Sequence, residues 1–169
     1  MRKEKPENVS SEVKKMAVVL TERMKGWIEL MGCHLCVATP DGVPWVTVSR
    51  FARVTKPDQV SFAMEKNEIG IIEDALSKNS WVAFGVSKQG GIRAAYQFKG
   101  KGKVFRSGNE FDNIKKMATE IATDAILTVD LTELYCTKPG AEAGQRLDVM
   151  PPAEVDAWEK ARWTDIPGK

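Results

Sequence analysis

The spacing of apolar residues divides the chain into helical and extended segments. Near the N-terminus apolar residues recur every three or four positions, which is typical of a helix with one apolar face; they are Val13, Met16, Ala17, Leu20, Met24, Trp27, Ile28 and Met31. Ser10 or Ser11 is a suitable N-cap, and Gly32 is a suitable stop. We therefore expect a helix over about residues 10–31.

The middle of the chain is rich in β-branched and aromatic residues that alternate with polar ones. This pattern predicts strands over 33–39, 44–55, 59–64, 81–87, 94–106 and 125–136. Pro40-Asp41-Gly42 and Lys56-Pro57-Asp58 have turn composition, so the first three strands are expected to form an antiparallel meander. Gly100 and Gly102 interrupt the fifth strand, which predicts a bulge or a close backbone approach.

The apolar period returns to that of a helix in three further places. We expect helices within about 68–78, with Asn67 as its cap, after Gly108-Asn109, and around 152–162. Most connections between strands are too short for parallel crossovers. The expected fold is mainly β (α+β), a six-stranded antiparallel barrel with flanking helices. We expect one domain over 1–169, with the barrel at about 33–138 and a tail at 139–169.

Composition narrows the classes of function. The formal net charge is +2 over 169 residues, which argues against a dedicated nucleic-acid binder. The longest clean apolar run, Met16–Leu20, is far too short to span a membrane, and no signal-type segment follows the charged N-terminus. Three cysteines, an odd number, favour reduced thiols. We expect a cytoplasmic protein with no nucleic-acid or membrane partner.

Cys33-His34-Leu35-Cys36 has the spacing of a redox or metal motif. A redox pair places its first thiol at a helix N-terminus, whereas this pair follows a helix and enters a strand. A metal site would need Cys33, His34, Cys36 and Cys136 together. We favour small, buried cysteines, a half-buried histidine and no metal site, although the metal site stays open as a weaker alternative.

Several cations are candidates for binding an anion. Lys99, Lys101 and Lys103 alternate along one strand face, which suits either a solvated face guarding a sheet edge or a cationic wall. Arg50 and Arg53 end the second strand, and Lys66-Asn67 precede a helix whose N-terminus suits a phosphate. Phe105 stands where a dinucleotide-binding glycine would be required, so a Rossmann site is excluded.

The order of these segments resembles a known family. The chain is similar to the FMN-binding split barrels of the pyridoxamine 5′-phosphate oxidase-like group, in particular its small FMN-binding proteins. The resemblance covers about residues 12–140 as a distributed pattern, and it rests on "CVATPDGVPWVTVSRFARV", "QVSFAM", "ALSKNSWVAFGV", "AYQFKGKGKVF" and "NEFDNIKKM".

The resemblance implies a homodimer with FMN bound at the subunit interface. On this basis the residues along the flavin ring or its phosphate are Thr47, Val48, Ser49 and Arg50. Those expected to meet the ribityl phosphate are Ala63, Met64, Lys66 and Asn67, with Glu65 in the same segment. The implied function is an FMN-dependent oxidoreductase or a flavin electron carrier. The sequence offers no clear acid–base pair, so no catalytic side chain is nominated.

One stretch departs from the family pattern. Many members carry basic residues at the start of the short helix, but counting back from Asn79 places Ile71 and Ile72 there. Lys66 could substitute from upstream, while Glu65 and Glu68 would oppose a phosphate. The alternative is therefore a non-catalytic split-barrel module that has lost FMN or binds haem or a deazaflavin.

Overall fold

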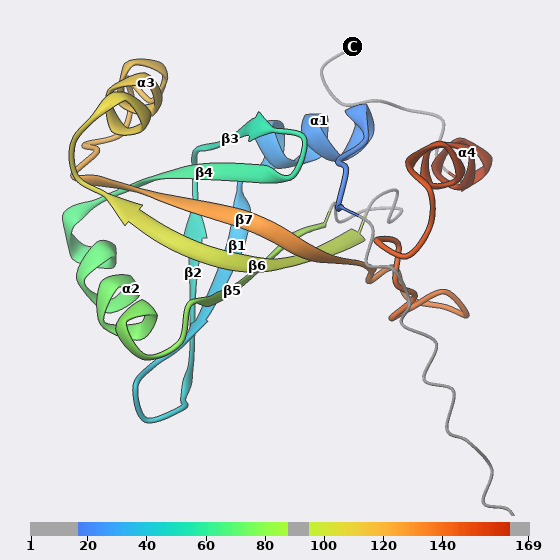
Figure 1. The fold of residues 1–169 in the computed structure, drawn as a ribbon, viewed down its shortest axis with the longest axis horizontal. Helices are drawn as coiled ribbons and strands as arrows, with labels where there is room; N and C mark the ends of the chain where they lie inside the picture. The colour runs from blue at the N-terminus through green and yellow to red at the C-terminus, as the bar shows by residue number, and fades with distance from the viewer. Residues whose placement is uncertain (1–16, 88–94, 163–169) are drawn as a thin grey trace, which may run out of the picture.

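The computed structural model describes residues 17–87 and 95–162, which form a curled antiparallel sheet with flanking helices (Figure 1). In chain order the elements are α1 (Glu22–Met31), β1 (Cys33–Ala38), β2 (Pro44–Ser49), β3 (Ala52–Lys56), β4 (Gln59–Met64), α2 (Lys66–Lys78), β5 (Trp81–Ser87), β6 (Ala95–Phe105), α3 (Asn109–Met117), β7 (Ala125–Cys136) and α4 (Pro152–Arg162). The strand order is β2-β1-β5-β6-β7-β4-β3. The fold is thus mainly β, as expected.

The sheet has seven strands, so the prediction of six is wrong. The segment expected to form one strand over 44–55 breaks at Arg50 and Phe51 into β2 and β3. These two strands lie at opposite edges of the sheet, where β2 pairs with β1 and β3 pairs with β4. The sheet must therefore curl until its two edges are joined by a very short connection. The buried Ser49 hydroxyl donates to the Phe51 carbonyl at 2.9 Å and holds this bend.

The N-terminal helix is shorter than expected. It begins at Glu22, because the Thr21 hydroxyl accepts a hydrogen bond from the Met24 amide at 3.2 Å and acts as the N-cap. Residues 17–20 form no helix or strand, and Val18 and Leu20 enter the core from this segment. The expected caps Ser10 and Ser11 lie outside the described residues.

Two glycine predictions are confirmed. Gly32 ends α1 with φ of 69°, a conformation that favours glycine. At Gly100 the register between β6 and β7 shifts, and a Cβ built there would lie 2.1 Å from the Asp130 carbonyl oxygen. The backbones of β6 and β7 can approach this closely only because residue 100 has no side chain.

The start of α2 differs from the prediction. The helix begins at Lys66, with Glu65 at the N-cap position, so Asn67 lies inside the first turn and is not the cap. Ile69, Ile72 and Ala75 form its buried face. The first turn of α2 consequently presents Glu65 and Glu68 toward the end of β2.

The C-terminal helix α4 reaches the core and the N-terminal end of α1 through individual side chains. Val155 and Trp158 are buried in the core, and Glu159 is only 1% exposed. The Tyr96 hydroxyl of β6 donates to the Glu159 carboxylate at 2.5 Å, and Arg23 of α1 is buried nearby and interacts with it electrostatically. Burial raises the pKa of Glu159, although hydrogen bonds from Thr21 and Tyr96 act in the opposite direction. A buried polar cluster therefore joins the tail to the barrel.

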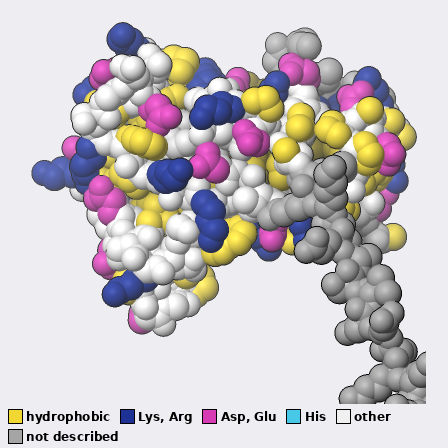
Figure 2. Space-filling model, in the orientation of Figure 1, with side chains coloured by type: hydrophobic (Ala, Val, Ile, Leu, Met, Phe, Trp, Pro, Cys, Tyr) yellow, Lys and Arg dark blue, Asp and Glu magenta, His cyan; other side chains and the backbone are white. Residues whose placement is uncertain are grey.

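The surface carries charges of both signs. Basic and acidic side chains are interspersed on the face shown in Figure 2, in keeping with the small net charge. In the described part of the chain, no helix is long and apolar enough to cross a membrane.

Candidate functional site

The two cysteines of the motif lie on opposite faces of β1. Cys33 faces the core and is fully buried, which raises the pKa of its thiol to about 12, whereas Cys36 is half-buried on the other face of β1. All three cysteines are free, and the described ranges contain no group of three potential metal ligands. His34 is exposed on the outer face of β1.

The segments expected to bind a flavin do meet in space. At the end of β2, the Thr47 hydroxyl donates to the Glu68 carboxylate of α2 at 2.5 Å. Arg50, just beyond β2, forms an ion pair with Glu65 at the N-cap position of α2. The β2 end and the α2 start therefore form one surface, and two carboxylates of α2 lie on it.

The eight predicted contact residues are placed differently relative to solvent. Val48 is 51% exposed, and Arg50, Lys66 and Asn67 are also exposed. Ser49, by contrast, is buried in the bend. Ala63 packs beneath α3, and Met64 is fully buried in the main core. The buried residues could offer a ligand little except backbone groups.

Ile71 and Ile72, which stand where many family members carry basic residues, also differ in their exposure to solvent. Ile71 is 39% exposed, whereas Ile72 is fully buried and packs in the core. Only Ile71 thus stands at a place where a side chain could face a ligand, and it is apolar. Of the predicted cations, Arg50 and Lys66 are the ones on this surface.

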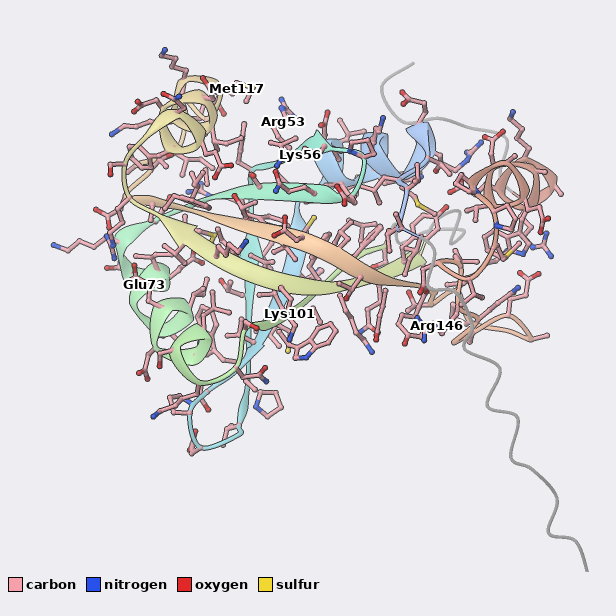
Figure 3. All side chains as sticks on the ribbon, in the orientation of Figure 1. Arg53, Lys56, Glu73, Lys101, Met117 and Arg146 are labelled. Carbon is pink, nitrogen blue, oxygen red and sulfur yellow. The ribbon has the colours of Figure 1, made fainter. Side chains whose placement is uncertain are left out.

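Two cavities share Met117, one of them is lined by Arg50, and neither was predicted from the sequence. The first, of about 320 Å³, is lined by Arg50, Phe51 and residues 117–121 after α3. The second, of about 590 Å³, lies between β3, β4 and α3, and Met117 lines both. Figure 3 shows Met117, Arg53 and Lys56 on this side of the sheet. No signal in the sequence brings α3 next to Arg50, because the contact depends on how the sheet curls.

The floor of the larger cavity is polar and hydrogen-bonded. Buried Ser61 shares a 2.9 Å hydrogen bond with Thr128, and the Gln59 amide donates to Asp130 at 2.7 Å. Arg53, Lys56 and Lys116 line the cavity together with the single acid Glu110. Its lining is therefore net positive and offers hydroxyl and amide groups.

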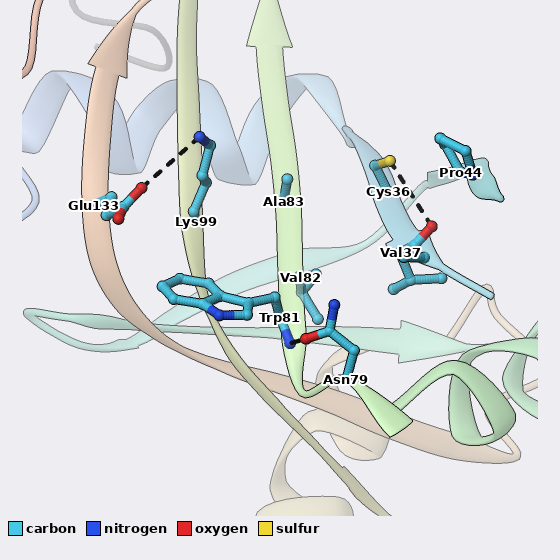
Figure 4. A pocket seen from close by; sticks show the side chains of 10 residues that line it. Cys36, Val37, Pro44, Asn79, Trp81, Val82, Ala83, Lys99 and Glu133 are labelled. Carbon is cyan, nitrogen blue, oxygen red and sulfur yellow. Dashed lines mark hydrogen bonds and ion pairs between the residues drawn. The ribbon is translucent and has the colours of Figure 1, made fainter. Parts of the chain in front are cut away.

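The outer face of β1, β5 and β6 carries a third cavity, of about 390 Å³ (Figure 4). Cross-strand pairing places Cys36, Ala83, Lys99 and Glu133 in one row across four strands. Small residues occupy the centre of this face, and exposed Val46, Val48 and Trp81 surround them. Such a face is flat and partly apolar.

The alternating lysines on β6 are engaged by neighbours. Lys99 pairs with Glu133 at 3.8 Å, and Lys103 pairs with Asp130 at 3.3 Å. The Lys101 ammonium lies 4.0 Å from the centre of the Trp81 ring. These contacts favour the interpretation of a solvated, charge-balanced face over a cationic wall.

Arg106 fixes the far side of α2. Its guanidinium donates to both oxygens of Glu73 at 2.9 and 2.8 Å and also pairs with Asp124. These hydrogen bonds from Arg106 lower the pKa of Glu73. Because Arg106 follows β6 and Asp124 precedes β7, the clamp holds α2 in place and so positions the Glu65–Glu68 turn.

The fold has counterparts among solved structures. HupZ from Group A Streptococcus matches with a TM-score of 0.64 at 17% identity, over 74% of this chain and 99% of its own. A Lactobacillus delbrueckii protein, named as a proposed pyridoxamine 5′-phosphate oxidase, matches with a TM-score of 0.58 at 16% identity, over 71% of this chain and 96% of its own. An FMN-binding protein from Syntrophomonas wolfei matches with a TM-score of 0.52 at 12% identity, over 67% and 81% respectively.

No known family model matches the sequence, and no curated protein is significantly similar to it. The structural matches define the class of fold. The chain has the split-barrel fold of the pyridoxamine 5′-phosphate oxidase-like and FMN-binding proteins.

Proposed function

We propose that this chain is an FMN-binding flavoprotein, an oxidoreductase or electron carrier whose cofactor lies along β2 and the start of α2. The observation that carries the proposal is the meeting of Thr47 and Arg50 with the first turn of α2, in a fold shared with an FMN-binding protein. When bound, FMN would supply the redox chemistry, while the protein sets its orientation and potential.

The residues fit the two parts of FMN unequally. The exposed edge of β2, with Val48 at 51% exposure, offers a flat surface to an isoalloxazine ring. Arg50, Lys66 and the N-terminus of α2 offer positive charge to the phosphate. The carboxylates of Glu65 and Glu68 lie at the same place, so the phosphate would be held only after Arg50 leaves Glu65.

We further propose that two copies of the chain pair through the outer face of β1, β2 and β5. Exposed Val46, Val48 and Trp81 surround a centre of small residues, Ala38, Ala83 and Gly85. Partly apolar faces of this kind mark contact surfaces. Because Val48 also belongs to the proposed flavin surface, a partner seated there would cover the ring.

The two cavities that share Met117 suit a small anionic substrate or redox partner. The smaller one adjoins the proposed flavin surface at Arg50, and the larger one has a net positive lining over a hydrogen-bonded polar floor. We nominate no acid–base pair for proton transfer among the residues that line either cavity. Their part would be to bind and orient a reactant next to the flavin.

The alternative function is a split-barrel binding module that has lost FMN or holds haem or a deazaflavin. It is favoured by the fully buried Ile72, by the apolar Ile71, and by the two carboxylates on the phosphate side of the surface. Such a module would bind no FMN but would keep the same fold.

FMN titration, followed by quenching of flavin fluorescence, tests the proposal. We expect Arg50→Ala and Lys66→Ala each to weaken FMN binding, because each removes a cation from the phosphate side. Lys78→Ala, at the opposite end of α2, is the matched control and should leave the affinity unchanged. Unchanged affinity in both test variants would show that the phosphate lies elsewhere.

A further inference from the structure

Glu65 and Glu68 already bind the groups that the proposed site would offer to a phosphate. Glu65 pairs with Arg50, the cation nearest the end of β2, and Glu68 accepts the hydrogen bond of the Thr47 hydroxyl. They lie three residues apart on the same turn, so both carboxylates face β2. The Arg50 charge and the Thr47 hydroxyl are thus already bound to carboxylates of the protein before any ligand binds.

The position of these carboxylates is electrostatically favourable. They lie at the N-terminal end of α2, where the backbone N–H groups and the helix dipole attract negative charge. Glu65 makes no side-chain capping bond, so its carboxylate is directed to Arg50 instead. An incoming phosphate carries up to two negative charges and would compete for the same guanidinium and the same helix end. At contact distance, like charges repel even in water.

We propose that Glu65 and Glu68 act as an internal anion that occupies the phosphate position and selectively weakens binding of phosphate-bearing flavins. This inference rests on the proposed flavin site. Riboflavin, which shares the ring of FMN but has no phosphate, does not compete with the carboxylates. Glu65 and Glu68 therefore determine which form of the cofactor the site prefers.

Binding of FMN and riboflavin is compared in the wild-type chain, Glu65→Gln, Glu68→Gln and the control Asp74→Asn. Asp74 is exposed on the same helix but lies beyond the first turn. We expect Glu65→Gln and Glu68→Gln each to tighten FMN about fivefold, as for one exposed charge pair, and to leave riboflavin within about twofold. Asp74→Asn should change neither affinity.

Most of the effect of Glu65 should pass through Arg50, because the phosphate must replace Glu65 in this ion pair. In an Arg50→Ala background, Glu65→Gln should therefore lose most of its gain for FMN, which a double-mutant cycle measures directly. Equal tightening of both flavins, or no tightening of FMN in either glutamine variant, overturns the inference, because neither pattern can arise from competition between anions.

Failure of the proposed function gives a different result. If neither flavin binds the wild-type chain or the glutamine variants, the flavin site is wrong. In that case a titration with inorganic phosphate tests whether Glu65 and Glu68 act as an internal anion. Phosphate binding is followed through the NMR signals of the Arg50 guanidinium and the α2 amides. A response at lower phosphate concentration in Glu65→Gln than in the wild type supports the inference, and identical titrations contradict it.

Discussion

At the scale of single residues, a buried hydrogen bond joins Tyr96 to Glu159. Both side chains are almost completely buried, and their hydrogen bond spans β6 and α4. We predict that Tyr96→Phe lowers the free energy of unfolding by about 1–3 kcal/mol, because it leaves a buried carboxylate with one donor fewer. Urea denaturation measures the change.

The matched control for Tyr96 is Tyr135. Its hydroxyl donates to Glu133 at 3.0 Å, but the residue is only half-buried. Tyr135→Phe should cost less than about 0.5 kcal/mol, as is usual for partly exposed positions. Equal costs for the two variants would show that the buried cluster adds nothing to the docking of α4.

Glu159 also predicts a pH dependence. Burial raises its pKa in the folded state above the ordinary value of 4.5, so the folded chain binds this proton more readily than the unfolded chain. Its contribution to the unfolding free energy therefore increases as the pH falls through the folded pKa toward 4.5.

Glu159→Gln removes this titration. Between pH 7 and pH 4.5, we expect the wild type to gain stability relative to Glu159→Gln, measured as the difference between their urea midpoints at each pH. Titrations of other groups cancel in this difference. A difference that stays constant with pH, or that changes in the opposite direction, would contradict the raised pKa.

At the scale of elements, a close approach of β6 to β7 depends on Gly100. A Cβ at this position would overlap the backbone of β7 at Asp130, which cannot move away as a flexible side chain can. Gly100→Ala should destabilise the protein by about 2 kcal/mol or more. Gly70→Ala, in open space on α2, should instead stabilise it by about 0.5–1 kcal/mol. Thermal unfolding of the two variants measures whether the first loses stability and the second gains it.

The elements themselves show what local sequence can predict. Strand positions followed from alternation, and Gly32 and Gly100 marked a stop and a close approach, because these features depend on the residue itself. The break at Arg50 and Phe51 was not predicted, since "WVTVSRFARV" alternates through it and only the curl of the sheet divides it. The early apolar residues suggested a longer helix, but Thr21 caps the helix at a later position and Leu20 lies before it, outside any helix or strand.

The candidate site came from the family resemblance, which assigned Thr47 and Arg50 to the same cofactor as Lys66 and Asn67. The structure brings Thr47 to Glu68 and Arg50 to Glu65, so the two segments lie together, while binding of the cofactor stays a prediction. The cavities lined by Met117 depend on the packing of α3 against the sheet, which connects residues far apart in the chain. No local pattern indicates such a contact.

At the scale of the whole molecule, the proposed dimer depends on the outer face of the sheet. We predict that replacing Val46 and Val48 together by lysine weakens self-association at least tenfold, because two charges would be buried against an apolar partner. Val149→Lys, at a comparably exposed valine outside the sheet, is the control. Light scattering over a concentration series measures the mass of each protein. Equally stable dimers of the wild type, the double variant and Val149→Lys would show that the interface lies elsewhere.

The most direct test of the central claim is the visible spectrum of the wild-type protein after FMN is added and unbound flavin is removed by gel filtration. We predict a flavin spectrum that elutes with the protein, at one FMN per chain and at the mass of a dimer. Protein that elutes without flavin absorbance, after exposure to excess FMN, would contradict it.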